Sequence, residues 1–108
     1  MNSRVNGKDL TALTAARSID EERDRQDAKW GVQNHTPEWW LAILMEEVGE
    51  LAQAILETHF DNGTDLGGMD NIRKEAVQCA AVAMAMIECI DRTANNAGER
   101  TLPAGDKP

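Results

Sequence analysis

Residues 39–56 read WWLAILMEEVGELAQAIL, an apolar segment with an acidic cluster at its centre. At about 100° per residue on an α-helix, Glu46 and Glu50 lie within about 40° of each other, and Glu47 lies about 100° from Glu46. The opposite arc of the helix is apolar and carries Trp40, Leu41, Leu44, Met45, Val48, Leu51, Ala52, Ile55 and Leu56. The segment therefore predicts an amphipathic helix whose acidic edge borders its buried edge.

The acidic cluster has two interpretations. Like charges one helical turn apart destabilise a helix by a few tenths of a kcal/mol per pair, so the cluster is mildly unfavourable unless something neutralises it. A hard divalent cation such as Mg²⁺ suits it, because carboxylate oxygens are the preferred ligands of such ions. The alternative is a solvated acidic face, since charge runs usually lie on the surface. The spacing of the glutamates alone leaves both interpretations open.

The chain is expected to form a single all-α domain over residues 1–108. Apolar periodicity predicts a bundle of three main helices. The expected helices span about residues 9–29, 37–58 and 71–92, with a loop at 59–69. Flexible termini are expected at residues 1–7 and 94–108, which lack apolar periodicity.

Local capping residues support these helix ends. Trp30-Gly31 is expected to end the first helix, because glycine is common just past a helix C-terminus. Thr36 is a suitable N-cap for the second helix, and Asp70 is a suitable N-cap for the third.

The second half of the first helix is charged on nearly every side, with both signs interleaved. One interpretation is a solvent-exposed helix with ion pairs such as Glu21 to Arg25. The other is that Arg25 or Lys29 holds phosphate groups. The charge pattern does not distinguish them.

The third helix has an apolar centre at residues 76–87, which contains five alanines and no charged residue. Such a segment requires burial on most sides, and three helices from one chain hardly surround it. We therefore expect the bundle to be completed by oligomerisation, as a homodimer or homotetramer.

Composition and hydropathy exclude several classes. The net charge of -8 and the pI near 4.6 argue against a nucleic acid polymer as partner, because its phosphates require a basic surface. No apolar run reaches the roughly 20 residues of a membrane span, and no signal peptide is apparent, so a cytoplasmic protein without a membrane partner is expected. Cys79 and Cys89 are too far apart on one helix to pair, and both are expected to be buried thiols.

Three segments in order carry a family resemblance: His35-Thr36-Pro37, EVGELA at residues 47–52, and EAVQ at residues 75–78. With them, about residues 20–93 resemble the MazG-like all-α nucleoside triphosphate pyrophosphohydrolases. The resemblance implies an ExxE motif on one helix and an ExxD motif on the next, which together bind Mg²⁺ in an oligomeric helical bundle. It also implies cleavage of a nucleoside or deoxynucleoside triphosphate to the monophosphate and pyrophosphate.

By this resemblance, Glu47 and Glu50 match the first metal motif, and Glu75 opens the second. Gln78 stands where the family has its last acid, so that ligand is an amide oxygen without negative charge. Glu46 is the additional acid before the first motif. Glu46 and Glu47 are the expected catalytic residues, with Glu46 placed to orient or deprotonate the attacking water.

Substrate contacts are expected from residues around this metal site. His35 resembles a histidine that lines the nucleotide pocket in the dCTP-hydrolysing relatives. Trp39 and Trp30 are the expected stacking residues for the base, because Trp40 lies on the buried arc of its helix; Arg25 and Lys29 are the candidates for phosphate contacts. The function predicted is a Mg²⁺-dependent pyrophosphohydrolase. A non-catalytic nucleotide-binding dimer or a helical interaction module remains the alternative.

Overall fold

The computed structural model describes residues 9–60 and 66–99 of the chain. These ranges contain helices and no strand, which confirms the expected all-α class. The helices are α1 (Leu10–Trp30), α2 (Pro37–Phe60) and α3 (Leu66–Glu99).

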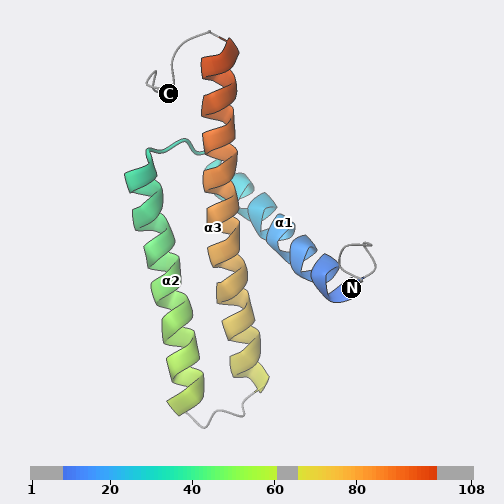
Figure 1. Ribbon diagram of the computed structural model, residues 1–108. Coiled ribbons are helices and arrows are strands. Elements are labelled where there is room, and N and C mark those ends of the chain that lie inside the picture. Colours follow the sequence, from blue (N-terminus) through green and yellow to red (C-terminus); the bar gives the residue numbers. More distant parts are fainter. Residues whose placement is uncertain (1–8, 61–65, 100–108) are drawn as a thin grey trace.

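α2 and α3 run antiparallel and lie side by side, whereas α1 diverges from them (Figure 1). α3 packs against both other helices, but α1 and α2 do not pack on each other. The Cα radius of gyration is 17.3 Å, compared with about 13 Å for a compact domain of this size. Within one chain, the three helices are therefore open and do not close into a bundle by themselves.

The ends of α1 lie where capping chemistry predicts them. The Asp9 side chain accepts hydrogen bonds from the backbone N–H groups of Thr11 and Ala12. At the other end, Gly31 adopts φ 74°, and its N–H donates to the Asp27 carbonyl at 2.8 Å. Glycine adopts this left-handed region without strain, which ends the helix at Trp30.

The loop between α2 and α3 is shorter than expected. α2 begins as predicted, with the Trp39 N–H donating to Thr36 Oγ1 at 3.3 Å, but it continues to Phe60. α3 already begins at Leu66, so Asp70 lies within the helix and the prediction that it is the N-cap is wrong.

Gly68 explains part of this error. A Cβ atom built at Gly68 would lie 2.5 Å from Thr58 Oγ1. The glycine therefore permits close approach of α2 and α3 at this end of the pair. The pair Gly67-Gly68 is typical of a turn and therefore predicts one. The sequence carries no information about Thr58, against which Gly68 packs.

The C-terminal part of α3 also differs from the prediction. Residues 94–99, expected to be flexible, are helical. No proline interrupts the segment, and adding residues to an existing helix gains one backbone hydrogen bond per residue. The remaining residues predicted to be flexible, 1–7 and 100–108, lie outside the described ranges.

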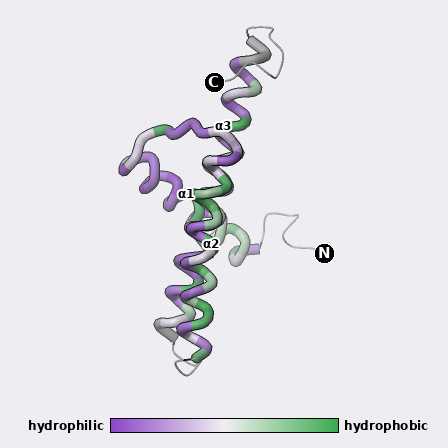
Figure 2. The backbone as a smooth tube through the Cα atoms, turned by 90° about the vertical axis from the view of Figure 1, so that its left-hand side faces the viewer, coloured by the Kyte–Doolittle hydropathy of each residue, from purple (hydrophilic) through white to green (hydrophobic). Residues whose placement is uncertain are grey.

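The core is small and lies between α2 and α3. Trp40 is 2% exposed, which confirms its expected place on the buried arc. It packs with Val82, Ala85 and Cys89. Hydrophilic residues dominate the second half of α1, whereas hydrophobic and hydrophilic residues alternate along α2 and α3 (Figure 2). Much of the predicted buried arc of α2 is nevertheless exposed within one chain, namely Leu41, Met45, Val48, Ile55 and Leu56.

The charged half of α1 is attached to α3 through Arg23, which is 8% exposed. One guanidinium nitrogen of Arg23 donates to Glu88 at 2.6 Å and to Asp27 at 3.1 Å. The other donates to Gln26 at 3.1 Å. The expectation of an entirely solvent-exposed charged surface is therefore wrong at this position. The ion pair expected between Glu21 and Arg25 is formed by Glu22 instead, at 2.7 Å.

Arg23→Ala is expected to lower the free energy of unfolding by about 1–3 kcal/mol. The substitution removes a buried aliphatic stem and the ion pair with the half-exposed Glu88. Urea denaturation followed by circular dichroism measures the change. A loss below about 0.5 kcal/mol, the usual range of surface substitutions, would contradict the anchoring role.

Candidate metal centre and adjacent cavity

Three glutamates from two helices converge between α2 and α3. Glu47 and Glu50 extend from α2, and Glu75 extends from α3. Each offers one carboxylate oxygen, and the three oxygens lie within 4.8 Å of one another. The structure thus brings together the three acids that the sequence assigned to one ion.

Two of these carboxylates are incompletely satisfied. Glu47 Oε1 and Glu75 Oε1 are buried and have no hydrogen-bond partner among the described residues. A buried carboxylate oxygen without a donor or cation is unfavourable. Oxygen-rich, negatively charged donor sets fit hard divalent cations, and Mg²⁺ is one of them. The residues present therefore fit the expected metal.

The pKa of Glu47 also indicates that its charge lacks a compensating cation among the described residues. Its pKa is raised above the ordinary value of 4.5, first by burial and then by repulsion from Glu50, Glu75, Glu46 and Glu22, in that order. Burial, followed by the charges of Glu47, Glu75 and Glu50, also raises the pKa of the nearby Cys79 thiol. Cys79 and Cys89 are both free, as expected, but only Cys89 is buried, and Cys79 is partly exposed. A raised pKa disfavours the reactive thiolate of Cys79.

Glu22 is a member of this environment that the sequence did not indicate. It lies on α1, yet its charge raises the pKa of Glu47 on α2. Its side chain is 13% exposed and pairs with Arg25. The charged half of α1 contains several acids, and only the way α1 crosses α3 determines that Glu22 faces the metal site.

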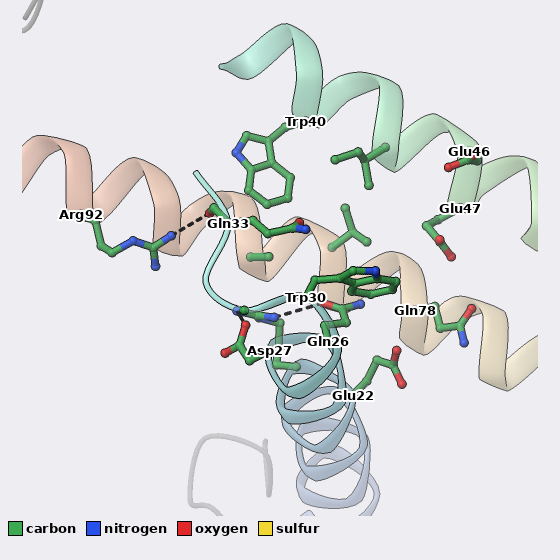
Figure 3. Close-up of a pocket in the computed structure, with 15 residues that line it drawn as sticks. Glu22, Gln26, Asp27, Trp30, Gln33, Trp40, Glu46, Glu47, Gln78 and Arg92 are labelled. Carbon is green, nitrogen blue, oxygen red and sulfur yellow. Dashed lines mark hydrogen bonds and ion pairs between the residues drawn. The ribbon is translucent and has the colours of Figure 1, made fainter. Parts of the chain in front are cut away.

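A cavity of about 310 Å³ opens beside the carboxylates. This volume is at the lower end of the range typical of small-molecule sites. Figure 3 shows Glu47, Gln78 and Glu22 toward one end of the cavity and Arg92 toward the other. The wall includes Glu22, Arg23, Gln26, Asp27, Trp30, Gly31, Gln33, Trp40, Ile43, Glu46, Glu47, Gln78, Val82, Ala85 and Arg92.

Two tryptophans line this cavity, Trp30 and Trp40. Trp30 is 57% exposed, whereas the buried Trp40 has an Nε1–H with no acceptor among the described residues. Trp39 is 59% exposed and lies outside the cavity wall, so the placement favours Trp40 over Trp39 as the second aromatic group.

The remaining predicted substrate residues lie around the cavity without lining it. His35 packs behind Trp40, with ring centroids 4.8 Å apart. Lys29 places its ammonium 4.7 Å from the centre of the Trp30 ring. Arg25 lines a separate, smaller cavity between α1 and α3. Glu46 and Gln78 both line the larger cavity, beside Glu47.

Gln78→Asp is expected to lower the Mg²⁺ concentration for half-maximal thermal stabilisation by about tenfold. The substitution adds a negative charge next to Glu47, and a cation at the cluster benefits from that charge. Thermal unfolding across a Mg²⁺ titration measures the effect. Destabilisation that Mg²⁺ does not reverse would place Gln78 away from the ion.

Glu47→Gln is expected to stabilise the metal-free protein at neutral pH by about 0.5–2 kcal/mol. Because the folded-state pKa of Glu47 is raised, the folded protein binds more protons than the unfolded chain between pH 4.5 and the raised value. The free energy of unfolding therefore falls as pH rises through this window, and the neutral amide removes that loss.

Urea denaturation in EDTA, at neutral pH and near pH 4.5, checks this prediction. The stability difference between wild type and Glu47→Gln should shrink at the lower pH, where the native carboxyl is protonated. A variant less stable than wild type at neutral pH would contradict repulsion at Glu47.

No helix in the described ranges is long and apolar enough to cross a membrane. Comparisons with protein-family models, curated proteins and solved structures gave no match to this chain. The function is therefore inferred from the residues and geometry of the site itself.

Proposed function

We propose that this protein is a Mg²⁺-dependent nucleoside triphosphate pyrophosphohydrolase, which releases a nucleoside monophosphate and pyrophosphate. The observation that carries the proposal is the pair of buried, unpartnered carboxylate oxygens of Glu47 and Glu75, next to a cavity of about 310 Å³. The resemblance of the three sequence segments to the MazG-like enzymes supports the same reaction.

Glu47, Glu50 and Glu75 hold the ion in this proposal, and Gln78 contributes a neutral amide beside them. When bound, Mg²⁺ supplies charge neutralisation at the phosphates and lowers the pKa of a water molecule. Its charge also offsets the repulsion that raises the pKa of Glu47.

Glu46 serves as the general base. It is exposed and lines the cavity beside Glu47, so its carboxylate can reach a water molecule there. The water oxygen forms the new bond to the α-phosphorus and its proton passes to Glu46. The bond between the α-phosphorus and the bridging oxygen breaks, and pyrophosphate leaves with that oxygen.

Trp30 binds the nucleobase, and the buried Trp40 forms part of the cavity wall behind it. Both line the cavity, and an aromatic wall favours stacking with any base. The amides of Gln26 and Gln33 provide polar groups for a base edge. His35 acts indirectly, by supporting the Trp40 ring from behind.

A second copy of the chain completes the fold in this proposal, most simply as a homodimer. An exposed seam on α2 repeats at alternating spacings of four and three residues, the spacing of paired helices. A single chain leaves this seam uncovered. Its four large hydrophobic side chains are 37–57% exposed, and the seam also contains one exposed alanine. The α2 seam consists of Leu41, Met45, Val48, Ala52 and Ile55.

A non-catalytic nucleotide-binding dimer is the second candidate. Gln78 favours it, because an amide in place of a carboxylate leaves the ion with less negative charge. This protein would bind Mg²⁺ and nucleotide at the same residues but turn over slowly.

A screen of the purified protein against the natural NTPs and dNTPs, with pyrophosphate release as the readout, tests the proposal. Mg²⁺-dependent release from at least one nucleotide is expected. Nucleotide binding without release would support the second candidate. Absence of both nucleotide binding and pyrophosphate release would contradict both candidates and favour a helical interaction module.

A further inference from the structure

A second cavity, of about 160 Å³, lies between α1 and α3. Its wall brings together three cations, Arg25 from α1 and Arg73 and Lys74 from α3. This gathering is notable in a chain with a net charge of -8 and only 11 basic residues. The other wall residues are Ser18, Glu21, Glu22 and Val77; Arg25, Arg73 and Lys74 are called the cation cluster below.

Two members of the cation cluster have no carboxylate partner among the described residues. Arg25 pairs with Glu22 at 2.7 Å. Arg73 instead donates to the hydroxyl of Ser18 at 3.0 Å, and Lys74 makes no hydrogen bond or ion pair within the described ranges. All three cations are exposed, so an anion from solvent can reach them.

The cation cluster adjoins the metal centre. Lys74 directly precedes Glu75 on α3, so the two side chains leave the helix about 100° apart at the same level. Glu22 lines both cavities, and its charge acts on Glu47. Around α3, Arg73 lies about 160° from Glu75, so Lys74 is the member of the cation cluster next to the carboxylates.

We infer that the cation cluster binds the terminal phosphates of the substrate and then the released pyrophosphate. This inference rests on the proposed function. Guanidinium and ammonium groups are the usual protein ligands of phosphate oxygens, and the Ser18 hydroxyl adds a further donor. The cluster also supplies the positive charge that a polyanionic substrate needs near an acidic protein.

Titration of ¹⁵N-labelled protein with inorganic pyrophosphate in EDTA tests the inference. Without Mg²⁺, pyrophosphate can bind only through the protein's own donor groups, and the positions of the shifted amides show which basic side chains hold it. Saturable shifts are expected at the amides of Ser18, Arg25, Arg73 and Lys74, in the wild type and also in Glu75→Gln. The double variant Arg73→Gln/Lys74→Gln should bind at least about tenfold more weakly.

Arg17→Gln is the matched control, because it removes the same charge from α1 at a residue that lines neither cavity. It should leave pyrophosphate affinity unchanged. No saturable binding by the wild type, or equal binding by the double variant, would overturn the inference.

Turnover of the same proteins separates this inference from the proposed function. If the wild type hydrolyses a nucleotide but the double variant keeps the same KM and the same inhibition by pyrophosphate, the inference fails and the proposed function stands. If pyrophosphate binding depends on the cation cluster but no nucleotide is hydrolysed, the anion site stands without the proposed reaction.

Discussion

Glu75→Gln is expected to lower Mg²⁺-dependent pyrophosphate release by at least about a hundredfold, and Glu47→Ala or Glu50→Ala should do the same. The three carboxylate oxygens lie within 4.8 Å of one another, so each substitution removes one of few ligands from a shared ion. Loss of even an indirect contact to a metal ligand commonly costs ten- to a hundredfold, and loss of a ligand costs more. The stabilisation of the fold by Mg²⁺ should disappear together with turnover.

Glu57→Gln provides the matched control. Glu57 lies on the same helix and accepts a hydrogen bond from Gln53, but it belongs neither to the carboxylate cluster nor to the cavity wall. This variant should keep both turnover and the response to Mg²⁺. Full activity in all three cluster variants, with unchanged circular dichroism, would refute the site.

Met45→Glu/Ile55→Glu is expected to convert the protein from a homodimer to a monomer. Both side chains lie on the α2 seam, 53% and 44% exposed within one chain. Pairing of two seams would bury the introduced carboxylates without partners, which strongly disfavours association. Light scattering should give twice the 11.9 kDa chain mass for the wild type and the single-chain mass for the double variant.

Val32→Glu controls for the added charge. Val32 lies between α1 and α2, outside the seam, and is 66% exposed. It should leave the dimer mass unchanged. A folded, monodisperse wild-type monomer at micromolar concentration would rule out the seam as a contact between copies.

Local chemistry made much of this fold predictable from the sequence. Gly31 and Thr36 set helix ends through backbone freedom and a capping side chain, and these predicted ends agree with the structure. The spacing of the acids on α2 predicted an acidic edge, and the family resemblance then assigned Glu47, Glu50 and Glu75 to one ion. Glu75 then required only that α2 and α3 lie side by side, as they do (Figure 1).

Features that depend on helix crossing were not predictable. The burial of Arg23, the approach of Glu22 to Glu47, and the meeting of Arg25 with Arg73 all arise where α1 crosses α3. Periodicity within one helix identifies its faces, but it does not say which part of another helix meets them. The sequence near this crossing therefore predicts either a solvent-exposed charged surface or a phosphate contact by Arg25 or Lys29, and does not indicate the burial of Arg23.

Gly68 shows a related limit at the other end of the molecule. Glycine is typical both of turns and of close helix packing, and only the position of Thr58 distinguishes the two. The same ambiguity applied to Trp40, whose ring belongs to the core and also lines the cavity.

The most direct test of the central claim is ³¹P NMR of the products formed from the nucleotide that the screen identifies, with Mg²⁺ and with EDTA. The proposed reaction predicts nucleoside monophosphate and pyrophosphate in equal amounts, only when Mg²⁺ is present. Release of inorganic phosphate with a nucleoside diphosphate, or equal cleavage in EDTA, would contradict it.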